Sequence, residues 1–386
     1  MIYRHLTPKL KELANFFPIV TLMGPRQSGK STLVQAVFKD YECVNLELKQ
    51  ERELAQNDPV AFFKRHPAPL IIDEVQRVPE LLEMLQVIVD KTPKKGQYII
   101  TGSHQPALHQ EISQSLAGRT AIIELLPLSI AELKGSKIDL SREECIFKGF
   151  MPRIFNESVP PDLLYQNYFS TYVERDVRKL INVSDINTFE RFLMLLAGRV
   201  GQILNLSSLA NEVGVSSTTL TKWLSVLEAS YIVFRLPCFF NNFGKRLVKA
   251  PKIYFVEPAL AANLLGISEL SQVERDPLFG NLFENVIVVE ALKARLNAGK
   301  RPELYYFRNN NGLEVDLILN NNRKIRPFEI KSSMTWTSSF SNNLNKFMKF
   351  ATNAEKPSVI YSGDIQNEVN GIEYLNFHNI SDIFSN

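Results

Sequence analysis

The stretch from Gly24 to Thr32 has the residue types and the spacing of a phosphate-binding loop. It reads Gly-x4-Gly-Lys-Ser, follows an apolar run that ends at Met23, and precedes a helical pattern. The glycines let backbone N–H groups turn inward on a phosphate chain, and the following helix presents its positive N-terminus. Lys30 can reach the β- and γ-phosphates, and the Ser31 hydroxyl can ligate Mg²⁺. The alternative is a Gly-rich turn with a surface lysine. We predict that ATP and Mg²⁺ bind across Gly24, Pro25, Arg26, Gln27, Ser28, Gly29, Lys30, Ser31 and Thr32.

Two carboxylates end a second apolar strand. Asp73 and Glu74 follow Leu70-Ile-Ile. Asp73 is placed to hold Mg²⁺ directly or through water, and Glu74 to orient and polarise the attacking water. A strand that ends in Asp-Glu means little alone. Behind a phosphate-binding loop it predicts an ATP hydrolase.

Two further residues are candidates for contact with the γ-phosphate. Ser103 lies at the tip of a predicted strand over 97–103, where this class of ATPase uses a polar residue against the γ-phosphate or the water. Arg119 lies between a predicted helix over 110–117 and a strand over 121–126, where ring-forming ATPases place an arginine finger that acts in a neighbouring subunit. The alternatives are a plain turn and a surface arginine at a helix end.

A second group of charged residues lies near the C-terminus. Glu329 and Lys331 are two apart on a predicted strand and so point to the same side, and Asp316 lies on the preceding strand of a predicted hairpin. Two carboxylates beside a lysine can bind a divalent metal ion and activate water for phosphodiester cleavage. The alternative is a strand-surface ion pair. Glu284 lies upstream on a predicted helix over 280–292.

The elements that position these residues follow from the apolar patterns. Alternating strands and helices in the first third predict an α/β fold, and residues 127–200 are predicted to be mostly helical. Residues 206–227 have a helix-turn-helix pattern, and strands over 231–236 and 246–248 would form a wing. The exposed face of the second helix would carry Ser217, Thr218, Thr221 and Lys222, which suits DNA contact. With a single charge there, protein packing is an equal alternative.

Composition excludes several classes of protein. The chain has 386 residues, 45% of them hydrophobic and 22% charged, which describes a globular protein with room for two or three domains. No apolar run approaches a membrane span, and the start lacks a signal-peptide pattern, so we expect a cytoplasmic protein. The three cysteines are isolated, which excludes a disulfide framework or zinc knuckle. The net charge of +3 permits nucleic-acid contact without arguing for it.

Together these motifs resemble one family. The loop 24–32, the strand 70–76, Ile100–Ser103 and Ser115–Arg119 are similar to those of prokaryotic AAA-type ATPases that carry a C-terminal domain of unknown function. Gly149-Phe-Met-Pro152 and Tyr172–Val177 also resemble signatures of that family. The arrangement Asp-x12-Glu-x-Lys resembles the restriction-endonuclease-like superfamily. That resemblance implies that Asp316 and Glu329 are metal ligands, that Lys331 positions water or stabilises charge, and that Glu284 assists the metal.

We therefore expect four parts: a P-loop AAA-type core (1–126), a helical lid (127–200), a winged helix (201–250) and a restriction-endonuclease-like α/β domain (251–386). The expected function is a Mg²⁺-dependent ATPase that couples ATP binding and hydrolysis to DNA binding or processing. The expected partners are ATP, DNA and further copies of the chain, without a membrane. The alternative is a nucleotide-switched scaffold whose C-terminal domain is catalytically inactive. A small-molecule kinase is disfavoured, because Glu74 suits hydrolysis.

Overall fold

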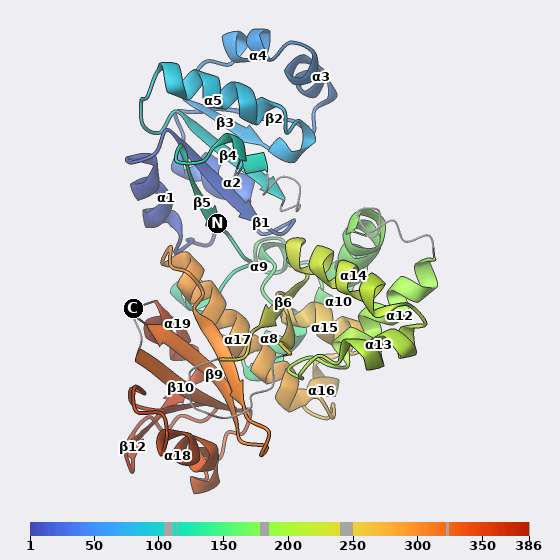
Figure 1. Cartoon of the computed structure of the whole chain (residues 1–386), viewed down its shortest axis with the longest axis vertical. Coiled ribbons are helices and arrows are strands. Elements are labelled where there is room, and N and C mark those ends of the chain that lie inside the picture. Colours follow the sequence, from blue (N-terminus) through green and yellow to red (C-terminus); the bar gives the residue numbers. More distant parts are fainter. Residues whose placement is uncertain (104–110, 113, 178–184, 240–249, 322–323, 386) are drawn as a thin grey trace. The chain divides into compact units, whose positions relative to one another are not determined.

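The computed structural model describes residues 1–103, 111–112, 114–177, 185–239, 250–321 and 324–385. The chain divides into two compact units (Figure 1). The first comprises residues 1–128 with the short segments 229–231 and 296–300, and the second comprises residues 129–228, 232–295 and 301–386. Among the helices described, none is long and apolar enough to cross a membrane. Each unit is built around a sheet of its own.

The first unit contains a five-stranded parallel sheet in the order β2-β3-β4-β1-β5. All its strands therefore end at one edge, where the polar residues predicted for nucleotide chemistry follow β1 and β3. This confirms the predicted α/β fold, and the structure adds that the sheet is parallel. The elements are α1 (Thr7–Ala14), β1 (Ile19–Gly24), α2 (Lys30–Val37), β2 (Glu42–Asn45), α3 (Lys49–Asn57), α4 (Pro59–Arg65), β3 (Leu70–Asp73), α5 (Leu81–Lys91), β4 (Tyr98–Ser103) and β5 (Thr120–Glu124).

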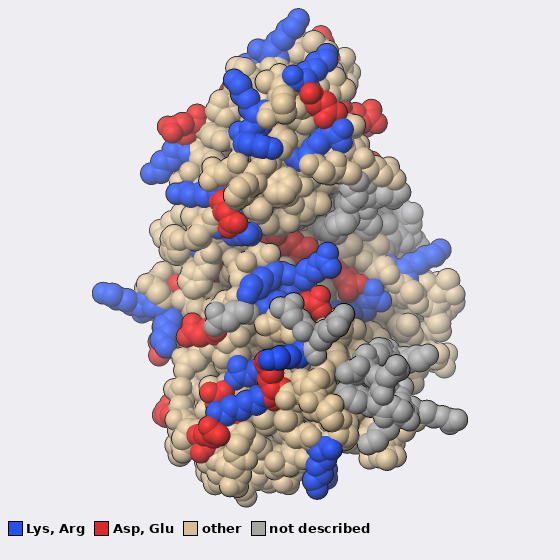
Figure 2. Space-filling model, turned by 60° about the vertical axis from the view of Figure 1, so that its left-hand side comes forward, with Lys and Arg blue, Asp and Glu red and all other residues tan. Residues whose placement is uncertain are grey.

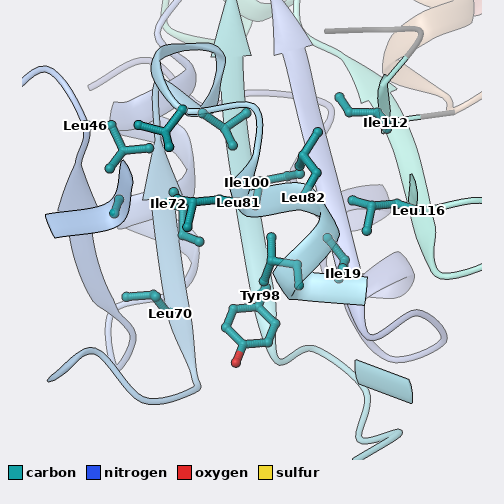
Figure 3. Close-up of a cluster of buried hydrophobic side chains, with 14 of the residues drawn as sticks. Ile19, Leu46, Leu70, Ile72, Leu81, Leu82, Tyr98, Ile100, Ile112 and Leu116 are labelled. Atoms are coloured by element: carbon teal, nitrogen blue, oxygen red, sulfur yellow. The ribbon is translucent and has the colours of Figure 1, made fainter. Parts of the chain in front are cut away.

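Helices cover both faces of this sheet, as a parallel sheet requires. On one face, α5 packs Leu81 and Leu82 against Ile72 and Ile100 (Figure 3), and α3 and α4 join the same cluster. On the other face, α1 and α2 pack against alternate residues of the same strands, such as Ile71. The strands bury both faces, and this explains why their sequences are continuously apolar rather than alternating.

The second unit begins with short helices. Asp185 caps α12 through the amide of Asn187, and Asn205 caps α13 through the amide of Ser208. The helices are α7 (Ile130–Gly135), α8 (Arg142–Lys148), α9 (Pro152–Asn156), α10 (Pro161–Tyr168), the π-helix η2 (Phe169–Val177), α12 (Ile186–Ala197), α13 (Leu206–Val213), α14 (Ser217–Ala229), α15 (Pro258–Leu264), α16 (Leu270–Val273) and α17 (Phe279–Asn297).

A two-stranded antiparallel sheet follows α14. Strand β6 (Val233–Leu236) pairs with β7 (Lys252–Phe255). The second wing strand predicted over 246–248 lies outside the described residues. The partner of β6 is instead β7, so this small sheet joins residues on both sides of the boundary expected at 250.

A six-stranded mixed sheet completes the second unit, in the order β12-β13-β11-β10-β9-β8. The antiparallel pair β9–β10 confirms the predicted hairpin, and α18 lays Leu344 and Phe347 on the apolar cluster of this sheet. The elements are β8 (Leu304–Arg308), β9 (Glu314–Asn321), β10 (Lys324–Lys331), η3 (Ser338–Ser341), α18 (Asn342–Met348), β11 (Ser358–Tyr361), β12 (Glu368–Val369), β13 (Ile372–Asn376), η4 (Phe377–Asn379) and α19 (Ile380–Phe384).

Candidate functional site

The predicted phosphate-binding loop leaves the end of β1 and runs into α2. Gly24 has a φ of 154°, and a Cβ at this position would lie 2.2 Å from the carbonyl oxygen of Leu125, so only glycine fits. Gly29, with a φ of 91°, turns the chain into α2. The guanidinium of Arg4 fixes the loop, since it donates hydrogen bonds to the carbonyl of Ser28 (2.7 Å) and to that of Leu126 (2.6 Å). Arg4 was missed in the sequence, because its partners are far away along the chain.

Lys30 begins α2 and is turned back into the loop. Its side chain is buried, and Nζ donates hydrogen bonds to the carbonyl oxygens of Gly24 (3.0 Å) and Pro25 (2.7 Å). Burial lowers the pKa of Lys30 to about 8, although the carboxylates of Glu74 and Asp73 act in the opposite direction. Among the described residues, this ammonium donates its hydrogen bonds to neutral carbonyl oxygens, so an anion would be a stronger partner for it.

The carboxylate of Asp73, at the end of β3, accepts three hydrogen bonds. The Ser31 hydroxyl donates to Oδ1 at 3.0 Å, Asn45 Nδ2 donates to Oδ2 at 3.2 Å, and the Thr101 hydroxyl also donates to Oδ1. The two residues predicted as Mg²⁺ ligands, Ser31 and Asp73, are therefore in contact. Asn45 and Thr101 were missed as site residues. Their position on strands that flank β3, near the same sheet edge, was the available signal.

Glu74 follows Asp73 with a left-handed backbone, at φ 61°. Gln76 Nε2 donates a hydrogen bond to its carboxylate, and Arg77 N donates to the Glu74 carbonyl at 3.0 Å. This conformation turns the chain sharply away from β3. Ser103 ends β4 and is in register with Gly24 of β1, but its side chain lies outside the described part of the chain.

Arg119 lies away from this site. Its carbonyl oxygen accepts a hydrogen bond from the amide of Ile19, which begins β1, whereas the loop follows the end of that strand. Its guanidinium binds both carboxylate oxygens of Asp90 on α5, at 2.7 and 2.8 Å. A β1 strand about 16 Å long separates Arg119 from the loop of the same chain.

The second group of predicted residues converges in the C-terminal sheet. Asp316 would be opposite Glu329 in the next step of the register that pairs Leu317 with Phe328, and Asp316 Oδ2 accepts a hydrogen bond from the amide of Ile330 at 2.8 Å. Lys331 Nζ lies 2.8 Å from Glu329 Oε1. Burial, and then the charge of Asp316, raise the pKa of Glu329 to about 8.

Glu284 on α17 has partners that the sequence analysis did not consider. Its Oε1 accepts hydrogen bonds from Lys252 Nζ at 2.9 Å and from Tyr254 Oη at 2.6 Å, both on β7. Lys252 also lies 2.6 Å from Glu314 Oε1, on β9 beside Asp316. We call Glu284, Glu314, Asp316 and Glu329 the acidic cluster.

The phosphate-binding loop and the acidic cluster each supply some of the oxygen ligands that a hard divalent cation needs. Mg²⁺ keeps several waters and is usually held through one or two carboxylates together with substrate phosphates. Ser31 with Asp73 supplies such oxygen donors at the loop. In the acidic cluster, Glu329 Oε2 is buried and has no hydrogen-bond partner among the described residues. Among all the residues that the structure describes, no group of three or more His, Cys, Asp or Glu residues is arranged to hold a metal ion by itself.

Three family models together match most of the chain. An AAA domain family matches residues 17–134, and two domains of unknown function, DUF8612 and DUF4143, match residues 140–271 and 279–380. Among solved structures, the Walker-type ATPase PABY2304 of Pyrococcus abyssi is 15% identical, with a TM-score of 0.41, over 68% of this chain and 96% of that chain. AMPPCP-bound DnaA from Aquifex aeolicus is 14% identical, with a TM-score of 0.29, over 58% of this chain and 85% of that chain.

Curated relatives extend the match beyond the first unit. The uncharacterized protein Rv2008c of Mycobacterium tuberculosis is 32% identical over 335 residues, which is 86% of this chain and 74% of that protein. An uncharacterized protein of Haemophilus influenzae is 23% identical over 308 residues. The chain belongs to the same family as Rv2008c, and its first unit is a P-loop ATPase domain of the AAA type.

Proposed function

We propose that the chain hydrolyses ATP with Mg²⁺ at the loop 24–32 of the first unit. The observation that carries this proposal is the contact between the Ser31 hydroxyl and Asp73 at the end of the neighbouring strand, beside the buried Lys30. Bound Mg²⁺ would supply charge neutralisation at the phosphates. Ser31 and Asp73 would hold it, and Asn45 and Thr101 would hold Asp73 in place.

Each of the remaining residues has a distinct role in this proposal. Lys30 would exchange its two carbonyl partners for the β- and γ-phosphate oxygens. Glu74 would accept a proton from the attacking water, and Ser103 would contact the γ-phosphate or that water. Because Arg119 lies at the opposite edge of its own sheet, it would act as a finger in a neighbouring copy of the chain.

Hydrolysis kinetics of two variants test the proposal. Lys30→Ala should lose ATP binding and hydrolysis together, whereas Glu74→Gln should keep ATP binding and lose at least about a hundredfold in kcat, as expected for a general base. The exposed Lys39, just beyond α2, provides the control Lys39→Ala, which should behave as wild type. Full hydrolysis by Glu74→Gln would exclude Glu74 as the base.

We further propose that the second unit acts on DNA in response to the nucleotide. Two observations support this function. The α13 and α14 helices with the β6–β7 sheet have the order of a winged helix, and the Ser216 hydroxyl caps α14 by accepting a hydrogen bond from the amide of Thr219. The convergence of Asp316, Glu329 and Lys331 on adjacent strands is the arrangement of a metal-dependent phosphodiesterase of the restriction-endonuclease-like type. In this proposal residues 127–200 form the lid of the ATPase.

The charge on one face of the molecule gives this second function no support (Figure 2). On the face shown in Figure 2, basic and acidic side chains are interspersed. A nucleotide-switched scaffold with an inactive C-terminal domain therefore remains the competing proposal. The test is Mn²⁺-dependent cleavage of single-stranded, duplex and branched DNA, with and without ATP, by wild type, Lys331→Ala and Lys30→Ala. Cleavage that Lys331→Ala abolishes supports the nuclease. ATPase activity without any cleavage supports the scaffold.

A further inference from the structure

Lys252 is a buried cation at the acidic cluster, yet it comes from outside the C-terminal sheet. It is 2% exposed, and its ammonium lies 2.9 Å from Glu284 and 2.6 Å from Glu314. Burial would lower the pKa of Lys252, but Tyr254 and the carboxylates around it outweigh burial and raise that pKa well above its usual value. The ammonium is therefore charged wherever the protein is folded at ordinary pH.

The two lysines of this region differ in what they can reach. The Lys331 side chain is 34% exposed and pairs with Glu329. The Lys252 side chain is 3% exposed and is enclosed by two carboxylates and the ring of Tyr306, whose centroid lies 5.7 Å from Nζ. Lys331 can meet a substrate, whereas Lys252 can act only through the groups it holds.

The position of Lys252 is that of a bridging cation. It joins Glu284 on α17 to Glu314 on β9, and Glu314 shares a face of its strand with Asp316. Arg308 adds a second positive charge to Glu314, at 2.9 Å. A divalent ion between Asp316 and Glu329 would be repelled by this ammonium and attracted by the same carboxylates that the ammonium neutralises.

We propose that Lys252 is a positioning residue of the acidic cluster: it fixes Glu284 and Glu314 and, as a resident cation, weakens the uptake of a divalent metal ion by Asp316 and Glu329. This inference rests on the proposed metal site. Lys252 belongs to β7, which pairs with β6, and Pro251 accepts a hydrogen bond from the amide of Leu204 just before α13. Through Lys252, the affinity for the metal ion would depend on the position of β7, the strand that connects the acidic cluster to the segment containing α13 and α14.

The test of the proposal is the binding of Mn²⁺ to the nucleotide-free full chain. Binding is measured by calorimetry and by the shift that Mn²⁺ causes in the unfolding temperature. The Mn²⁺ that Glu329→Gln removes defines the site. Lys252→Met should bind Mn²⁺ at this site at least about tenfold more tightly than wild type, because the positive charge that Lys252 places beside the acidic cluster is lost. Mn²⁺ should also raise its unfolding temperature more than that of wild type. Lys252→Arg keeps the charge and should bind as wild type does.

The outcomes separate this inference from the proposed function. Equal Mn²⁺ affinity in wild type and Lys252→Met, at a site that Glu329→Gln removes, would overturn the role of Lys252 and leave the metal site standing. Absence of any such site in both proteins would overturn the metal site and this inference together. If Lys252→Met does not fold, Lys252→Met/Glu284→Gln is compared with Glu284→Gln alone. The same tightening of about tenfold or more is expected in that neutralised background.

Discussion

Glu257 is a buried carboxylate that joins two helical segments of the second unit. Its Oε1 accepts a hydrogen bond from the amide of Phe150 at 3.0 Å. Its Oε2 is buried without a hydrogen-bond partner among the described residues. Burial raises the pKa of Glu257 to about 7, although Lys293 and the Phe150 amide act in the opposite direction. The folded unit therefore binds a proton here at a pH where the unfolded chain has released it.

This proton makes the stability of the second unit depend on pH. The raised pKa means that the folded state binds more protons between about pH 4.5 and 7, so the free energy of unfolding should fall as pH rises through that window, by up to about 3 kcal/mol. Glu257→Gln should remove the part of that slope that this proton contributes and leave the part due to Glu329, whose pKa is also raised. Both tryptophans, Trp223 and Trp336, lie in the second unit, so denaturant titrations followed by tryptophan fluorescence at pH 5 and 8 report on it alone. An unchanged slope in Glu257→Gln would assign the effect to another group.

At the scale of elements, the junction of α8 and α9 explains the motif Gly149-Phe-Met-Pro152. Gly149 has a φ of 63°, and a Cβ there would lie 2.0 Å from Glu257 Oε1 and 2.4 Å from the Tyr165 hydroxyl. Phe150 is fully buried, and the Lys293 ammonium lies over its ring, 3.7 Å from the centroid, in a cation–π contact. The motif is explained by close packing of the backbone against α15.

Gly149→Ala should therefore lower the free energy of unfolding of the second unit by more than a positive φ alone costs an alanine. We expect a loss of about 2 kcal/mol or more. Gly266→Ala is the matched control, since Gly266 has a φ of 83° and open space around it, and its substitution should cost about 1 kcal/mol. Equal losses in the two variants, measured by fluorescence-detected unfolding, would show that the contact with Glu257 adds nothing.

Helices and strands could be predicted from the sequence better than the contacts that individual side chains make. Continuous apolar runs predicted the strands β1 and β3, which the structure confirms. The order of loop, strand and paired carboxylates predicted the nucleotide site. Arg4 and Lys252 were missed because their partners are distant in the chain and their neighbours carry no motif. Glu284 was found as a residue, but its binding to Lys252 and Tyr254 depends on the packing of β7 against α17.

At the scale of the whole molecule, Arg119 gives the clearest test of assembly. It lies at the sheet edge opposite its own loop, paired with Asp90. If it acts as a finger on a neighbouring copy, Arg119→Ala and Lys30→Ala should each be inactive alone. Their mixture should recover part of the wild-type hydrolysis rate, because an Arg119→Ala subunit can receive the finger of a Lys30→Ala subunit. A normal rate for Arg119→Ala alone, or no recovery on mixing, would exclude this role.

Helix α17 has one more consequence. It is buried along most of its length, and Asn285 bonds to both backbone groups of Phe255 while Glu290 accepts from the amide of Ile130 at 2.8 Å. The contact of Asn285 with Phe255 crosses the border between the regions that match the two domains of unknown function, whereas that of Glu290 with Ile130 joins α17 to the region that matches the AAA domain. Separating the two regions of unknown function would expose the side of α17 that is buried against Phe255. In evolution they should therefore be gained, lost and recombined as a single cassette, with substitutions around α17 compensated on the far side of that border.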